Sequence, residues 1–266
     1  MVNLLFRELK AYRKSLIIWS VGIVFLIVAG MSKYAGLESS GESMNELMAA
    51  MPKSLQAIMG TGTLDLSSPI GYYGVLYLYL LLMATIHATM LGATILAKEE
   101  RDKTFEFLFV KPITRTTVIT MKVVAAVINI VIFNVVTLLS SIFFVDFYGN
   151  GENVIEDILM LMGGMFILQI LFLTIGTAIA SVIRKPKKAA SFSTGLLLLT
   201  FMLSVAVDLS EKLDVLKYIT PFKYFDAKNM LNGEAFEPVY VMLSLLIIGI
   251  LTVVTFAFYK KKDLNV

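Results

Sequence analysis

A dense charged and aromatic stretch, residues 97–122, contains the residue types in this sequence that can do chemistry. It combines acidic and basic side chains with Phe105, Phe107, Leu108 and Phe109, and it lies between two apolar runs. Aromatic anchors among charges of both signs are typical of a docking surface, in which the rings supply affinity and the charges fix the register. The alternative is an amphipathic loop that rests on lipid headgroups. The sequence favours docking of a partner.

Patterns for catalysis and metal binding are absent from the sequence. There is no cysteine, which excludes disulfides, thiolate metal sites and a Cys nucleophile. No nucleotide-binding G-x-x-x-x-G-K-[ST] loop, Ser-His-Asp set or HExxH zinc pattern occurs, and His87 is the single histidine. We therefore expect no catalytic residue, metal site or cofactor in this chain and no nucleic-acid partner. Energy for any work has to come from a protein partner.

A methionine stripe formed by Met44, Met48 and Met51 leaves two interpretations open. Thioether sulfur suits Cu(I), but methionine is more often a packing residue. Packing is the preferred interpretation.

The composition indicates a membrane protein. Of the 266 residues, 58% are hydrophobic and 16% are charged, whereas soluble domains carry roughly 45–50% apolar and about 25% charged residues. Apolar runs extend from one end of the chain to the other, which leaves no room for a separate soluble domain. We expect an all-α integral membrane protein with a single membrane domain over residues 1–266.

Six apolar runs are long enough to cross a bilayer core about 30 Å thick, which takes ~20 helical residues. They are residues 16–32, 70–97, 118–145, 158–183, 189–207 and 239–259. Residues 2–15 precede the first run, with Leu5, Leu9 and Tyr12 recurring at helical spacing on one side. They predict an N-terminal amphipathic interfacial helix, either a lipid anchor alone or one that also braces the cytoplasmic face.

Charge placement predicts the orientation of the spans. Segments 1–14, 98–122, 184–188 and 260–266 hold most of the 23 Lys and Arg residues, whereas segments 33–69, 146–157 and 208–238 hold most of the 20 acidic residues. By the positive-inside rule, we expect a multi-pass protein of the cell membrane with both termini in the cytoplasm. Segments 33–69 and 208–238 are then extracellular and are expected to form short helices.

The polar residues in the middle of the spans are uncharged. No Asp, Glu, Lys or Arg occupies the middle of a span, which disfavours a proton or sodium carrier. Ala84, Ala88 and Gly92 form a small-xxx-small pattern, so this face of the second span is expected to pack closely on protein. A structural role is preferred for His87, with a place in a substrate path as the alternative.

The second and third spans and the stretch between them resemble permease subunits of the type-2 family of ABC (ATP-binding-cassette) exporters. The residues that match the family pattern are Glu99, Glu100, Thr104, Glu106, Leu108, Phe109, Pro112, Thr114, Arg115 and Lys122. Lys103 stands where the family has glycine. Residues 217–233 and the six-span layout are also similar to the family.

The resemblance implies a six-helix permease domain that pairs with a second permease chain, as a homodimer or a heterodimer, and binds two copies of an ABC ATPase subunit. That subunit would bind ATP and Mg. Residues 101–109 would form the cytoplasmic coupling helix between spans two and three. The predicted partner-binding residues are Glu99, Glu100, Arg101, Thr104, Phe105, Glu106, Phe107, Leu108, Phe109, Pro112 and Arg115. The resemblance also implies a substrate path between the second and fifth spans of the two protomers, which would place Thr85, His87, Ser193, Thr200 and Ser204 near it.

The expected function is that of a membrane-spanning subunit of an ATP-driven exporter, which is not itself an enzyme. Because the spans are mostly apolar and uncharged, the expected cargo is amphipathic, such as an antibiotic, an antimicrobial peptide or a lipid-like molecule. The alternative is a non-transporting membrane scaffold or sensor that binds its partner through the same stretch.

Overall fold

The computed structural model describes residues 2–40, 44–61, 64–102, 114–149, 154–234 and 236–262, and the elements within these ranges are helical. The long helices are α1 (Val2–Ser40), α4 (Pro69–Arg101), α6 (Arg115–Tyr148), α7 (Ile155–Val182), α8 (Pro186–Leu209) and α10 (Pro238–Lys261). The short elements are α2 (Met44–Ala49), α3 (Lys53–Met59), η1 (Glu211–Tyr218), η2 (Pro221–Lys223), α9 (Ala227–Asn229) and η3 (Met230–Glu234). The prediction of an all-α chain is confirmed for these residues.

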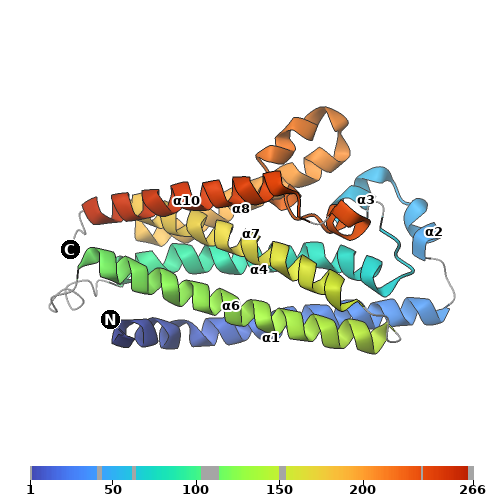
Figure 1. Cartoon of the computed structure of the whole chain (residues 1–266), viewed down its shortest axis with the longest axis horizontal. Helices are drawn as coiled ribbons and strands as arrows, with labels where there is room; N and C mark the ends of the chain where they lie inside the picture. The colour runs from blue at the N-terminus through green and yellow to red at the C-terminus, as the bar shows by residue number, and fades with distance from the viewer. Residues whose placement is uncertain are drawn as a thin grey trace.

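The six long helices form one elongated bundle (Figure 1). Each is long and apolar enough to cross a membrane, which confirms the six predicted spans. Helix α1 begins and α10 ends at the same end of the bundle, called the terminal end below, while α2 and α3 lie at the opposite end. Which end faces the cytoplasm stays a prediction.

Helix α1 is continuous over 39 residues. Residues 2–15, predicted to lie on the membrane surface as a separate helix, form its first turns, so the separate helix is not confirmed. The physical reason is that neither proline nor glycine occurs between Val2 and Val21, and nothing else in the sequence breaks the backbone hydrogen-bond ladder.

Helices α4 and α7 form the centre of the bundle. In their most apolar stretches, 72% and 61% of residues are buried, against 11% in α10. A Cβ atom on Gly92 of α4 would lie 2.3 Å from the Leu173 carbonyl oxygen, and one on Gly176 of α7 would lie 2.4 Å from the Thr89 carbonyl oxygen. The two backbones approach this closely because both positions are glycine. The prediction that the Ala84–Ala88–Gly92 face packs on protein is confirmed.

The predicted short helices lie at the opposite end. Segment 33–69 contains α2 and α3, as expected, and Gly60 ends α3 in the left-handed conformation at φ 72°. Segment 208–238 contains η1, η2, α9 and η3, short helical elements of different types. Met48 lines a cavity of about 190 Å³ together with Lys33 and Tyr79, and the preference for packing over Cu(I) binding at the methionine stripe stays a prediction.

Candidate functional site

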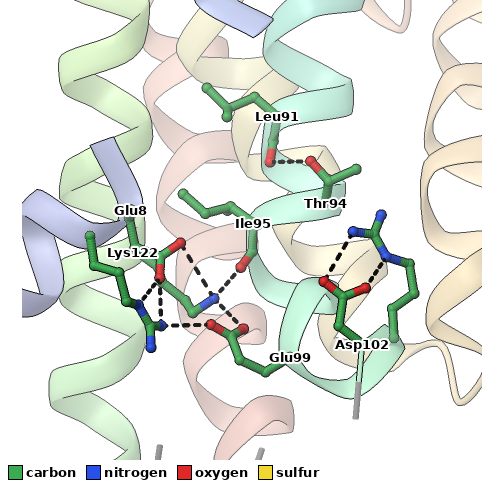
Figure 2. A network of polar contacts seen from close by, with 9 residues as sticks. Glu8, Leu91, Thr94, Ile95, Glu99, Asp102 and Lys122 are labelled. Carbon is green, nitrogen blue, oxygen red and sulfur yellow. Dashed lines mark hydrogen bonds and ion pairs between the residues drawn. The ribbon is translucent and has the colours of Figure 1, made fainter. Parts of the chain in front are cut away.

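A cluster of four charged side chains, three of them buried, lies at the terminal end, where α1, α4 and α6 meet (Figure 2). Lys122 of α6 forms an ion pair with Glu99 of α4 and donates to the Ile95 carbonyl oxygen. Its Nζ also lies 4.0 Å from Oε2 of Glu8 in α1. Arg7 completes the set, with Nη2 at 2.7 Å from Glu8 Oε1 and 2.9 Å from Glu99 Oε1. We call Arg7, Glu8, Glu99 and Lys122 the buried charge cluster.

The buried charge cluster is electrically balanced, with two cations and two carboxylates. The Lys122 and Glu8 side chains are fully buried and Glu99 is 5% exposed, whereas Arg7 is 50% exposed. Burying ions costs several kcal/mol per ion, so such a group persists only when the geometry pairs each charge. The ammonium of Lys122 donates hydrogen bonds to two oxygens, those of the Ile95 carbonyl and of Glu99 Oε2. Buried Glu8 Oε2 instead interacts with it as an ion pair and accepts no hydrogen bond from a described residue. The cluster therefore ties three helices together at a defined register.

Helical spacing brings these side chains to one point. Lys122 lies about two turns inside α6, and Glu99 lies in the last turn of α4. Glu8 lies on the side of α1 that also carries Leu4, which is buried. The unbroken start of α1 is thus tied to α4 and α6 through Glu8 and Arg7.

A second set of polar contacts joins α10 to the same end. Glu100, next to Glu99, forms an ion pair of 2.7 Å with Lys262, whose Nζ also donates to the Ala180 carbonyl oxygen of α7. Arg115 Nη1, at the start of α6, donates to the carbonyl oxygens of Lys260 and Lys262 at 2.9 Å each. A guanidinium at these orphan carbonyls caps the C-terminus of α10.

The two sets fix both ends of the segment between α4 and α6. Glu99 and Glu100 hold the last turn of α4, while Arg115 and Lys122 hold the first turns of α6. Asp102 C-caps α4, and the Thr114 hydroxyl caps α6 by accepting from the backbone N–H of Thr117 at 3.2 Å. A force applied to residues 103–113 would therefore act directly on α4 and α6. The ion pairs and hydrogen bonds described above would pass it on to α1, α7 and α10.

A family model described as ABC-2 family transporter protein matches residues 2–264, almost the whole chain. The chain belongs to the ABC-2 transporter family. A search of curated proteins found no match. Membership in the family makes this a multi-pass membrane protein with a transport permease role and not a catalytic enzyme. ABC-2 permeases generally work with an ABC ATPase subunit.

Of the partner-binding residues predicted for this ABC-2 permease, four lie within the described residues. Glu99, Glu100 and Arg115 contact other parts of the same chain, and exposed Arg101 pairs with its neighbour Asp102 at 2.9 Å. The intramolecular contacts assign the first three a positioning role. The other predicted contacts lie outside the described residues; they are Thr104, Phe105, Glu106, Phe107, Leu108, Phe109 and Pro112. Most of the proposed coupling helix at residues 101–109 also lies outside them.

The predicted path residues of the permease lie on two helices, Thr85 and His87 on α4 and Ser193, Thr200 and Ser204 on α8. His87 is buried between the rings of Trp19 in α1 and Phe133 in α6, at centroid distances of 5.6 Å and 4.8 Å. The hydroxyls of Thr85, Ser193, Thr200 and Ser204 each donate to a carbonyl of their own helix. Such bonds satisfy a hydroxyl in an apolar setting. These contacts give the five residues structural roles within one chain, and a substrate path between two chains stays a prediction.

A small cavity between α4 and α8 is the described space nearest to the predicted path. Ser204 lines it together with Tyr77 and Asp208, and its volume is about 20 Å³. That is enough for roughly one water molecule. Any cargo that passes between α4 and α8 of a single permease chain would have to part these helices.

A second group of charges borders this cavity and fixes the irregular segment between α8 and α10. Lys223 lies 2.7 Å from Asp208 of α8 and 2.9 Å from Asp226, and Lys228 lies 3.6 Å from Asp208. We call Asp208, Lys223, Asp226 and Lys228 the α8–α9 charge cluster. Asp226 also N-caps α9 by accepting from the Lys228 backbone N–H at 3.2 Å.

Sequence reasoning missed the roles of Glu8 and Lys122. From the sequence, Glu8 has no predicted role and Lys122 is only a residue that matches the family pattern, because a single charge near a helix end is ordinary. Two signals were available: Glu8 interrupts the apolar side of residues 2–15, and Lys122 lies inside an otherwise apolar run.

Proposed function

We propose that this chain is the membrane-spanning subunit of an ATP-driven exporter. In this proposal, a separate ABC ATPase subunit, present in two copies, docks on residues 101–115 and carries the ATP and Mg. A second permease chain, identical or different, completes the transporter. The terminal end of the bundle then faces the cytoplasm.

The observation that carries this proposal is the fixation of both ends of segment 103–113 by the buried charge cluster and by Arg115. A docking segment transmits force only if its ends are anchored to the spans, since a loose loop would absorb the movement. Here, α4 and α6 are joined to each other and to α1 and α10 by charges with little exposure to solvent. A partner that shifts the segment would therefore move these helices together.

Exposed apolar surface supports an amphipathic cargo and a second permease chain. Helices α1 and α8 bury only 17% of the residues in their most apolar stretches. Phe25 of α1 is 72% exposed, and Leu199 and Met202 of α8 are 68% and 60% exposed. Lipid, a second permease chain and apolar parts of a cargo all suit such faces.

The test uses the full chain together with an ABC ATPase encoded beside its gene. We expect the ATPase rate to rise when the two proteins are combined in liposomes. The changes Glu106→Ala and Phe107→Ala should lower that rise, because they remove a charge and a ring from the docking segment. The matched changes Glu156→Ala and Phe192→Ala, at exposed positions on other helices, should leave it unchanged. Stable binding without stimulation would instead support the scaffold or sensor.

A further inference from the structure

A polar pocket of about 470 Å³ lies at the terminal end beside α7 and α10. It is lined by Glu100, Ser181, Val182, Arg184, Phe258, Lys261 and Lys262. Its volume falls within the range of small-molecule sites, ~300–1,000 Å³. The ion pairs and hydrogen bonds at the two ends of segment 103–113 do not explain why this space is open.

The pocket has a surplus of positive charge. Lys262 is neutralised by Glu100 at 2.7 Å and held by the Ala180 carbonyl oxygen. Arg184 and Lys261 are exposed, and no ion pair or hydrogen bond joins either side chain to another residue that the structure describes. These two cations therefore favour an anionic ligand, and the planar guanidinium of Arg184 suits the paired oxygens of a phosphate.

One wall of the pocket is apolar and open. Phe258 is 51% exposed and Val182 is 49% exposed. Towards the middle of α10, Val254 and Leu251 lie on the same side of the helix as Phe258, at i−4 and i−7, and both are half-buried. A ligand that fills the charged part would meet a continuous apolar strip next to it.

The position of the pocket matches the headgroup layer of a bilayer. Helix α7 ends at Val182 and α10 ends at Lys261, so the lining residues lie where two membrane-spanning helices leave their apolar stretch. Basic pockets between spans at this level are suited to anionic lipid headgroups.

We propose that this pocket binds an anionic phospholipid of the adjacent leaflet. Its phosphate lies between Arg184 and Lys261, and an acyl chain runs along the Phe258 side of α10. A soluble phosphate would use the charges and leave the apolar strip uncovered. This inference is independent of the proposed function, because lipid binding needs neither the ATPase nor a cargo.

The test is native mass spectrometry of the purified full chain in a mild detergent. Dioleoyl phosphatidylglycerol and dioleoyl phosphatidylcholine are titrated separately, because they share acyl chains and differ in headgroup charge. We expect phosphatidylglycerol to bind at least tenfold more tightly. Inorganic phosphate and glycerol 3-phosphate, added as competitors, should not displace it. Displacement by either at equal concentration would overturn the lipid assignment in favour of a soluble phosphate.

The variants separate this pocket from general surface charge. The pair Arg184→Gln and Lys261→Gln should weaken phosphatidylglycerol binding roughly 25-fold, at about fivefold for each charge. The pair Lys187→Gln and Lys188→Gln removes the same charge from exposed positions of α8 outside the pocket, and should change binding less than twofold. Val182→Glu, which adds a carboxylate at the pocket mouth, should match the first pair. Equal losses in both Gln pairs, or wild-type binding by Val182→Glu, would overturn the proposal.

Discussion

Glu99 and Lys122 lie 23 residues apart, on opposite sides of the segment between α4 and α6, and form an ion pair inside the bundle. Because of this pair, the last turn of α4 and the first turns of α6 cannot separate without breaking a buried electrostatic contact. Glu8 and Arg7 extend the contact to α1. The start of the chain, the end of α4 and the start of α6 therefore form one unit.

Loss of Lys122 should be strongly destabilising. Lys122→Met leaves the buried carboxylates of Glu8 and Glu99 facing each other with only Arg7 to balance them, and breaking a buried pair costs about 3–5 kcal/mol. Thermal unfolding of the purified protein in detergent measures the effect. Lys187→Met, at an exposed site, is the matched control.

A second change separates lost charge pairing from lost packing. In the double variant Lys122→Met with Glu99→Gln, one of the unpaired charges is removed, so part of the stability should return. Unfolding of Lys122→Met at the same temperature as Lys187→Met would contradict the buried charge cluster.

The close approach of α4 and α7 depends on glycine. Gly176→Ala places a methyl group 2.4 Å from the Thr89 carbonyl oxygen and 2.8 Å from the Ala93 nitrogen, both of which are backbone atoms. We expect a loss of about 1–3 kcal/mol from overpacking. Gly249→Ala in α10 is the control, because a Cβ atom there meets nothing within 4 Å. If both variants unfold alike, the α4–α7 packing described here is incorrect.

His87 is expected to be replaceable. Its ring packs between Trp19 and Phe133, and its Nδ1 has no hydrogen-bond partner among the described residues. His87→Phe keeps an aromatic ring of similar size and removes a buried unsatisfied atom, so stability should stay within about 1 kcal/mol or improve. Export by a reconstituted transporter should be unchanged. A folded His87→Phe variant without export would return His87 to the substrate path.

The α8–α9 charge cluster predicts a response to acid. Burial alone would raise the pKa of Asp226, but the charges of Lys223 and Lys228 outweigh it and hold that pKa below its ordinary value. Burial alone would lower the pKa of Lys223, but Asp226 and Asp208 outweigh it and raise that pKa. Asp226 contributes its full stabilisation of the folded state above about pH 4, and this stabilisation is lost as pH falls through its depressed pKa. The Lys223 contribution is lost only at strongly alkaline pH, as pH rises through its raised pKa.

The α8–α9 charge cluster should therefore cause no change in the unfolding temperature from about pH 5 to 9. Below about pH 4, protonation of Asp226 should contribute to a fall in the unfolding temperature. Asp226→Asn should lower the unfolding temperature at pH 7 and make the decline in acid shallower. Asp214→Asn, which removes a carboxylate that is 60% exposed, should change neither. An acid decline as steep in Asp226→Asn as in the wild type would exclude the cluster as its source.

The sequence predicted the spans because membrane crossing requires ~20 apolar residues in a row, a local property. It predicted the buried face of α4 for a similar reason, since small residues every four positions form one helical face. The cluster of Glu8, Glu99 and Lys122 could not be predicted in this way. It depends on how three helices pack, and each charge alone resembles an ordinary charge at a membrane interface.

Glu99 and Glu100 show the same limit in the candidate site. The resemblance to the family predicted that both carboxylates bind a partner, but residue type alone does not distinguish a carboxylate that binds a partner from one that anchors the end of α4. Their partners Lys122 and Lys262 come from two other parts of the chain, and only the fold brings them together.

The most direct test of the central claim is whether the ends of α4 and α6 move as one unit. The chain has no cysteine, so spin labels can be attached at Arg101→Cys and Thr116→Cys, both exposed, and their separation measured by electron paramagnetic resonance. With the ATPase subunit bound, the account predicts one narrow distance distribution that is the same with and without ATP. It should broaden in Lys122→Met. A distance that shifts with ATP while Lys122 is intact would contradict the account.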